Sequence, residues 1–225
     1  KVYIRDKVHM AQTLNVPMKL GSHAAGTVRP PLLVTATRWT LGLEEGGGFS
    51  FDNERPAHEV VVPEFEIDAQ AVTWAQFVEF VDDGGYDRPE LWHPRGWRFV
   101  QAGERRAPRY VEHMGVASGA VSQTCFGTCH RMTGAQPVMH VSWWEADAWC
   151  RWAGRRLPAE VEWELAAHTA AGRGFRWGEV WEWMGTSFRA YPGFEADPYR
   201  DYSVPCFETH KVLRGASFAT RARMK

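Results

Sequence analysis

The chain has little net charge, few cysteines and no long hydrophobic run. Its 225 residues include 26 Lys and Arg against 27 Asp and Glu, a formal net charge of −1. This balance gives no electrostatic reason to expect nucleic acid or an anionic membrane as a partner. No apolar stretch approaches the roughly 18 residues of a membrane-spanning helix, and the first residues lack the apolar core of a signal peptide. We therefore expect a soluble, cytoplasmic protein.

Four cysteines in a chain of this length do not make a disulfide framework. Cys150 lies on the apolar face of an expected helix and is interpreted as a small buried hydrophobe. Cys125, Cys129 and His130 form a C-x3-C-H pattern that would suit zinc. Structural zinc sites generally need a second ligand pair, and no convincing pair follows. A loop with two free thiols is the favoured interpretation.

Tryptophan, by contrast, is abundant. The chain has 12, and eight of them lie between Trp143 and Trp183, interleaved with glutamate and arginine. Each buried indole N–H needs a hydrogen-bond acceptor. We therefore expect an aromatic-rich, polar-lined region in which packing and a concave site are built together.

Short strands are predicted in two regions, residues 32–42 and 58–68, where Phe65 and Ile67 alternate with acids. A Gly-rich loop separates these regions, and a further strand begins at Lys211. Residues 101–136 show no clear period and are expected to form a long loop, which in a compact domain is often functional.

Three short helices are predicted. Two begin with capping boxes, Thr73 with Gln76 and Ser142 with Glu145, and both end at glycines. The third begins at Pro158, a favourable first-turn residue. Together with the strands and the many loops, these helices indicate an α+β fold with low regular content.

The expected domain organisation has three parts. Residues 1–20 are expected to be the tail of a helical domain, and residues 21–31, which contain Gly, Pro and Ser, a linker. Residues 32–225 are expected to form the main domain. Because both ends of the chain fall within expected elements, we expect a fragment of a longer protein, with this domain incomplete at its C-terminus.

Four segments, in the same order, resemble the formylglycine-generating-enzyme-like (sulfatase-modifying-factor) domain. They are NERPAHEVVVPEFEIDAQAVTWAQFVEFV, PVMHVSWWEADAWCRWAGRRLPAEVEWELAA, WGEVWEWMGTSF and VLRGASFATRARM. The resemblance covers about residues 32–225 and implies a C-type-lectin-like fold.

Within this superfamily, two regions look like one branch. GFRWGEVWEW followed by YPGFEADPYRDYSVPCFETHKVLRG, and DNERPAHEV followed by GGYDRPELWHPRGW, resemble the sulfoxide synthases of ergothioneine biosynthesis and the selenoneine synthases. The segment WWEADAWCRWAGRRLP resembles the selenoneine synthases more than the sulfoxide synthases. Formylglycine generators need a reactive cysteine pair near the C-terminus, and no cysteine follows Cys206, which argues against that chemistry.

The resemblance implies an iron enzyme with a DinB-like helical domain before the present one. Such enzymes use Fe(II) and O₂ to join sulfur or selenium to C2 of the imidazole of hercynine. The donor would be cysteine, γ-glutamylcysteine or a selenosugar. Three ligands that leave open positions suit this chemistry. In the family an H-x3-H-x-E motif and a distant histidine supply them, whereas here only His9 stands in the corresponding helix, without a carboxylate two residues on. A metal-free, lectin-like binding module is therefore an alternative.

Tyr191 stands where the synthases place an active-site tyrosine, so the resemblance implies a catalytic phenol. It would deliver a proton or hydrogen atom and keep thioether oxidation from competing. A turn tyrosine packed on Pro192 is the alternative. Trp177, Trp181 and Trp183 would form an aromatic wall for the quaternary ammonium of hercynine; an ordinary core role is favoured for them.

The arginines near the C-terminal end are candidates for binding an anionic co-substrate. Arg214 and Arg221 would steer a sugar phosphate or a peptide carboxylate. Arg156 is expected instead to pair with a glutamate of the following helix. His140 is interpreted as a structural histidine in preference to a base, and Asp52 as part of a loop that either borders the site or only makes a turn.

Overall fold

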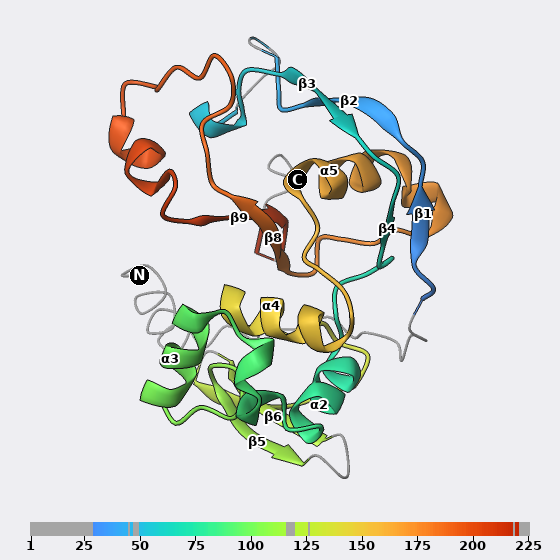
Figure 1. Ribbon diagram of the computed structural model, residues 1–225, viewed down its shortest axis with the longest axis vertical. Coiled ribbons are helices and arrows are strands. Elements are labelled where there is room, and N and C mark those ends of the chain that lie inside the picture. Colours follow the sequence, from blue (N-terminus) through green and yellow to red (C-terminus); the bar gives the residue numbers. More distant parts are fainter. Residues whose placement is uncertain are drawn as a thin grey trace. The chain divides into compact units, whose positions relative to one another are not determined.

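A computed structural model describes residues 29–44, 46, 50–115, 120–125, 127–217 and 219–220. The expected helix tail at residues 1–20, with His9, lies outside the described residues, and so do most of the linker and Arg221. The described residues form two compact units. The first comprises residues 72–155, and the second comprises residues 29–71 and 156–220. Helices and strands are mixed, as predicted (Figure 1).

Helices and a small antiparallel sheet build the first unit. Its described elements are α2 (Trp74–Asp82), η2 (Gly85–Asp87), η3 (Pro89–Leu91), α3 (Pro94–Ala102), β5 (Val111–Gly115), β6 (Ala120–Cys125), β7 (Thr128–Met132) and α4 (Trp143–Trp152). The three strands lie in the order β5-β6-β7, each antiparallel to its neighbour.

The predicted capping boxes are confirmed. Thr73 accepts a hydrogen bond from the backbone N–H of Gln76 at the start of α2, and Ser142 accepts one from Glu145 at the start of α4. The helices stop where glycines adopt positive φ, at Gly84 and Gly154, because a residue without a Cβ takes up this conformation easily.

The prediction of a long loop over residues 101–136 is wrong. This stretch contains the end of α3 and all of the β5-β6-β7 sheet. In β6 the alternate residues Val121, Gln123 and Cys125 are buried, so the strand has period two. The buried face includes a glutamine and a cysteine, and this hides the alternation from a search for apolar residues.

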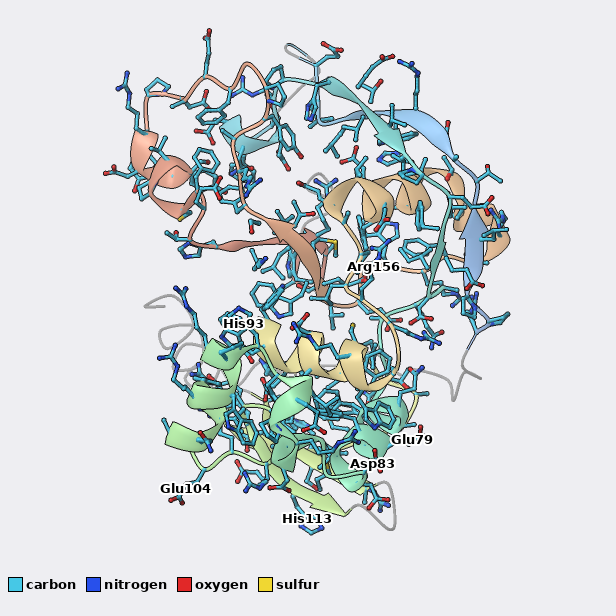
Figure 2. All side chains as sticks on the ribbon, viewed as in Figure 1. Glu79, Asp83, His93, Glu104, His113 and Arg156 are labelled. Carbon is cyan, nitrogen blue, oxygen red and sulfur yellow. The ribbon has the colours of Figure 1, made fainter. Side chains whose placement is uncertain are left out.

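Helix α3 was also not predicted. His93 caps it by accepting from the backbone N–H of Arg95, and His93 is labelled in Figure 2 at the start of this helix. Only Gly96 and Val100 are buried in it. A Cβ on Gly96 would come within 2.8 Å of the Trp144 side chain of α4. The helix therefore packs through a glycine, a residue that a search for apolar positions does not count.

Aromatic rings fill the core of the first unit, and several of their polar atoms are hydrogen-bonded. The buried Tyr86 hydroxyl donates to Glu145 Oε1 at 2.7 Å. The Trp92 indole N–H donates to the carbonyl of Gly85 at 2.8 Å. The Trp152 indole donates at the same distance to Asp83, whose position Figure 2 labels. These two indoles thus find acceptors, as expected, whereas the fully buried Trp74 indole N–H has no hydrogen-bond partner among the described residues.

Three two-stranded antiparallel sheets, one α-helix and several short 3-10 helices build the described part of the second unit. Its described elements are β1 (Leu32–Val34), β2 (Thr37–Leu41), η1 (Asp52–Glu54), β3 (His58–Val62), β4 (Phe65–Ile67), α5 (Glu160–Thr169), η5 (Ala171–Arg173), β8 (Trp181–Ser187), η6 (Arg200–Tyr202), η7 (Val204–Cys206) and β9 (Lys211–Gly215). The pairs are β1-β4, β2-β3 and β8-β9. The predicted strands are confirmed, and α5 begins two residues later than predicted because Ala159 is its N-cap.

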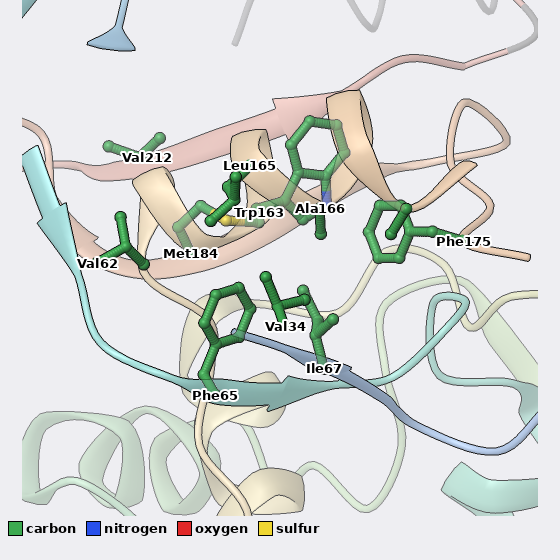
Figure 3. Packing of buried hydrophobic residues seen from close by; sticks show 11 residues of the cluster. Val34, Val62, Phe65, Ile67, Trp163, Leu165, Ala166, Phe175, Met184 and Val212 are labelled. Atoms are coloured by element: carbon green, nitrogen blue, oxygen red, sulfur yellow. The ribbon is translucent and has the colours of Figure 1, made fainter. Parts of the chain in front are cut away.

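Helix α5 packs against strands of all three sheets of its unit. Figure 3 shows Trp163, Leu165 and Ala166 of this helix in one cluster with residues of β1, β4, β8 and β9. Phe65 and Met184 are among the buried members. Each such side chain contributes about 1.5–3 kcal/mol through burial. This core fixes the position of the first turn of α5, which carries the candidate site. No described helix has both the length and the apolarity needed to cross a membrane.

Candidate functional site

Tyr191 lies in the loop after β8, and its side chain reaches the first turn of α5. Its hydroxyl donates to Glu160 Oε1 at 2.9 Å. Its ring contacts the ring of His58 edge-on, with centroids 4.6 Å apart. Gly42 lies against the same ring, because a Cβ on Gly42 would be 3.0 Å from Tyr191 Cε2. The phenol is therefore fixed at both its ring and its hydroxyl.

Arg214 of β9 joins two carboxylates of α5. Its guanidinium donates to Glu160 Oε1 at 3.4 Å and also to Glu164 Oε2. Glu160 and Glu164 are four residues apart and so lie on one face of the helix. The side chains of Arg214, Glu160 and Glu164 are 22%, 13% and 8% exposed. Trp39 adds an indole N–H to Glu164 Oε1 at 3.0 Å.

The proton affinities in this cluster follow from burial and from Glu160. Burial, the negative charge of Glu160 and the hydrogen bond to it raise the pKa of Tyr191 well above its ordinary value, against the opposing effect of Arg214. Burial also raises the pKa of Glu160, while Arg214 and the Tyr191 hydroxyl act in the opposite direction. Tyr191 is therefore a neutral phenol at neutral pH and carries a transferable proton.

A third carboxylate, Glu182 of β8, lies opposite Arg214 in the β8-β9 ladder. It accepts a hydrogen bond from the Trp163 indole at 3.1 Å. Burial raises its pKa to about 7, against the lowering effect of that hydrogen bond. Glu182 is thus partly protonated near neutral pH.

The three candidate tryptophans differ in exposure. Trp177 is 36% exposed and Trp181 48% exposed, so the favoured core role is wrong for these two. Trp183 is partly buried. Trp177 contacts Trp163 edge-on, with ring centroids 5.4 Å apart. An aromatic surface that can meet a ligand therefore lies beside Glu182, as an aromatic wall requires.

Several other predicted residues have plain structural partners. Arg156 forms two hydrogen bonds to Glu162, at 2.7 and 2.6 Å, as predicted for a pair with a glutamate of the next helix. His140 has a positive φ of 62°, and its ring contacts Tyr110. Burial and the nearby Arg109 lower its pKa.

The C-x3-C-H segment lies in the β6-β7 hairpin and is not a loop. Cys125 pairs with Thr128 and Cys129 with Thr124, so the two thiols project from opposite faces of the sheet. Both cysteines are free. Cys150 is buried in α4, as predicted.

Iron ligands were expected from the helix that contains His9, outside the described residues. Within the described part of the chain, no group of three or more His, Cys, Asp and Glu side chains could hold a metal ion. The residues around Tyr191 therefore do not fit an iron centre by themselves.

Sequence reasoning missed Glu160, Glu164 and Glu182 as site residues. The first two were considered only as partners of the arginines near residue 156. The available signal was their i, i+4 spacing at the start of a helix, which places two carboxylates on one face. It also missed Ser203, whose buried hydroxyl donates to Asp52 Oδ1 and links the loop at Asp52 to the segment after Tyr191.

Comparison with known proteins identifies the family that the sequence segments resemble. The sulfatase-modifying factor enzyme 1-like domain matches residues 22–179. The chain is 34% identical over 254 residues to the hercynine oxygenase of Mycolicibacterium smegmatis, covering 92% of this chain and 58% of that protein. It is 36% identical over 213 residues to the hercynine oxygenase of Mycobacterium tuberculosis, covering 76% and 49%.

A formylglycine-generating enzyme, that of Streptomyces coelicolor, is 37% identical over 168 residues, covering 68% of this chain and 51% of that protein. The chain therefore spans about half the length of the curated relatives it matches. These matches confirm the resemblance inferred from the four sequence segments. The chain belongs to the sulfatase-modifying factor enzyme 1-like domain family.

Proposed function

We propose that this chain is part of an Fe(II)- and O₂-dependent enzyme that joins sulfur or selenium to C2 of the imidazole of hercynine. The observation that supports this most directly is the 34% identity to a hercynine oxygenase over 92% of the chain. For a thiol donor the reaction balances if the C2–H and S–H bonds break and a C–S bond forms. One oxygen atom of O₂ then oxidises the sulfur to a sulfoxide, and the other leaves as water.

Tyr191 is the proposed proton donor. Its phenol is held neutral beside a buried carboxylate, and proton transfer from a positioned side chain is an effective form of catalysis. Because the described residues supply no complete ligand set, iron would be held by residues outside them. The role of Tyr191 is limited here to positioning and supplying its own proton.

Trp177 and Trp181 are proposed to contact the quaternary ammonium of hercynine. Indole faces attract cations, and both rings are exposed. The carboxylate of Glu182, one indole away through Trp163, favours the same charge. For an anionic co-substrate, Arg221 and Arg214 stay the proposed cations, although a ligand of Arg214 would compete with two carboxylates.

The test uses the purified full-length protein. We expect it to take up about one ferrous ion, following the three-ligand open sites of this type of oxygenase, and to consume O₂ only when hercynine is present. Supplying cysteine, γ-glutamylcysteine and a selenosugar in competition identifies the donor. A protein that binds hercynine without iron or turnover would be a binding module, and the enzyme proposal would fail.

The Tyr191→Phe variant tests the catalytic residue. Loss of one hydroxyl should change the ratio of coupled product to oxidised donor, while hercynine binding persists. Tyr199→Phe is the matched control, because Tyr199 is 68% exposed and removes the same group away from Glu160. Unchanged products and rate in Tyr191→Phe would remove Tyr191 from the site.

Formylglycine generation is the second candidate, favoured by the 37% identity to the enzyme of Streptomyces coelicolor. This match covers 68% of the chain, compared with 92% for the hercynine oxygenase of Mycolicibacterium smegmatis. Incubation with a cysteine-containing sulfatase-type peptide separates the two candidates. Conversion of that cysteine to an aldehyde, with no dependence on hercynine, would replace the leading proposal.

A further inference from the structure

Glu160 occupies the centre of the cluster around Tyr191. A single oxygen, Oε1, accepts hydrogen bonds from both the Tyr191 hydroxyl and the Arg214 guanidinium. The backbone N–H of Glu160 donates to Thr186 Oγ1 of β8 at 2.9 Å. The residue is thus tied to β8, to β9 and to the loop after β8 at once.

The ring of Tyr191 has little freedom to turn away from this oxygen. His58 contacts one edge of the ring at a centroid distance of 4.6 Å, and Gly42 lies against Cε2. Gly42 has a φ of 92°, a conformation that glycine adopts without strain. The ring position and the acceptor position are therefore set by different parts of the unit: the residue after β2, strand β3 and helix α5.

We propose that Glu160 is the positioning residue of Tyr191: held by Arg214, it directs the Tyr191 O–H and keeps the phenol neutral. This rests on the proposed role of Tyr191 as a proton donor. Glu160 acts through Tyr191 and is not itself assigned a contact with substrate. A carboxylate that accepts the hydroxyl proton favours the neutral phenol, because a phenolate would face a negative charge.

Arg214 has a separate part in this arrangement. A carboxylate as buried as Glu160 would tend to take up a proton, and a protonated acid would no longer oppose ionisation of Tyr191. The guanidinium of Arg214 favours the charged form of Glu160, and it also donates a hydrogen bond to Glu164. The charged and titratable side chains that act on Tyr191 and Glu160 are His58 of β3, Glu160 and Glu164 of α5, and Arg214 of β9.

Tyrosinate absorbance in the full-length protein tests this directly. The Tyr191 contribution is the difference between a protein and the same protein with Tyr191→Phe. In the wild type this difference should stay at the phenol value up to alkaline unfolding. In Glu160→Gln, which removes the charge and keeps the shape, tyrosinate should form at least about one pH unit lower. Glu66→Gln, an exposed position of β4, should leave the titration unchanged.

An equal titration of Tyr191 in the wild type and in Glu160→Gln would overturn the proposal. If Glu160→Gln does not fold, Glu160→Asp replaces it. This variant keeps the charge within the network but withdraws the carboxylate from the hydroxyl by one methylene, and it should shift the titration in the same direction. No shift in a folded Glu160→Asp would likewise count against the proposal.

Turnover supplies a second, independent readout. Glu160→Gln should lower kcat for hercynine about tenfold or more, in line with the size of general acid catalysis, while KM stays within about twofold. Its alkaline limb in the pH profile of kcat should move to lower pH. If Tyr191→Phe behaves as the wild type, the proton-donor role fails, whereas the tyrosinate titration still reports on Glu160. The two failures are therefore distinguishable.

Discussion

Replacing Glu182 with glutamine should make the protein more stable at alkaline pH and change little at acid pH. Glu182 is a carboxylate beside the Trp163 indole, and its pKa is raised to about 7 by burial. The cation nearest in the ladder, Arg214, is engaged with Glu160 and Glu164. The ionised form of Glu182 therefore has only partial compensation in the folded state.

The sign and size of the Glu182 contribution to the free energy of unfolding follow from proton linkage. The folded state holds the Glu182 proton up to a pH of about 7, whereas the unfolded chain releases it near the ordinary value of 4.5. Its contribution is therefore fully present below about pH 4.5 and is lost as the pH rises through 7. Over that window the loss amounts to at most about 3 kcal/mol. Glutamine accepts the same indole hydrogen bond and has no charge to develop.

Urea unfolding of wild type and Glu182→Gln at pH 5, 6, 7 and 8 measures this. The difference in free energy of unfolding, variant minus wild type, should be small at pH 5 and should grow toward pH 8. Other carboxyls, including Glu160, are common to both proteins and cancel. Glu66→Gln serves as the exposed control and should give a flat difference. A flat difference for Glu182→Gln would refute a buried, proton-retaining Glu182.

Two further substitutions test packing and hydrogen bonding elsewhere. Tyr86→Phe removes the buried donor to Glu145 and should cost about 1–3 kcal/mol in urea unfolding; a loss below about 0.5 kcal/mol, the scale of an ordinary surface substitution, would contradict that. Gly42→Ala places a Cβ 2.9 Å from a carbonyl oxygen of η1 and 3.0 Å from the Tyr191 ring, at a positive φ. It should cost more than Gly46→Ala, where φ is also positive but no described residue comes within 4 Å of the added Cβ. Equal losses would show that only the backbone strain matters.

Local signals predicted those parts of the fold in which sequence and burial agree. The alternation of Phe65 and Ile67 with acids predicted a strand with one buried face, and both side chains are buried. The capping pairs at Thr73 and Ser142 marked two helix starts to the residue. In each case the information lies within a few consecutive residues.

The sheet at β5-β6-β7 shows why local signals fail elsewhere. The buried face of β6 carries Gln123, which is fully buried and donates to the carbonyls of Arg109 and Met139 at 3.3 and 3.4 Å. A buried polar side chain is tolerated where it is hydrogen-bonded. Those acceptors come from chain segments 14 and 16 residues away, so no short window of sequence contains the reason for its burial.

The contacts of the candidate site cannot be predicted from local sequence either, because they join residues that lie even farther apart in the chain. Tyr191 was selected by resemblance, but its acceptor Glu160 is 31 residues earlier in the chain. Arg214 was assigned to an anionic ligand because it lies with other arginines near the C-terminal end of the chain. The structure brings Glu164 to it across 50 residues. Pairing of this kind depends on how α5 packs against β8 and β9, which the sequence pattern alone does not determine.

The charges near Trp163 bear on the kind of ligand this part of the molecule accepts. Arg214 pairs with Glu160 and Glu164, whereas the carboxylate of Glu182 accepts a hydrogen bond from the Trp163 indole. Burial is the main cause that raises the pKa values of Glu160 and Glu182, so the ionised form of each carboxylate is disfavoured in the folded protein. A cation close to Glu182 would favour its ionised form, and an anion would disfavour it. The exposed Trp177 ring contacts Trp163, whose indole donates to Glu182. This arrangement supports the proposed contact of Trp177 with a quaternary ammonium more than a contact with a carboxylate or phosphate.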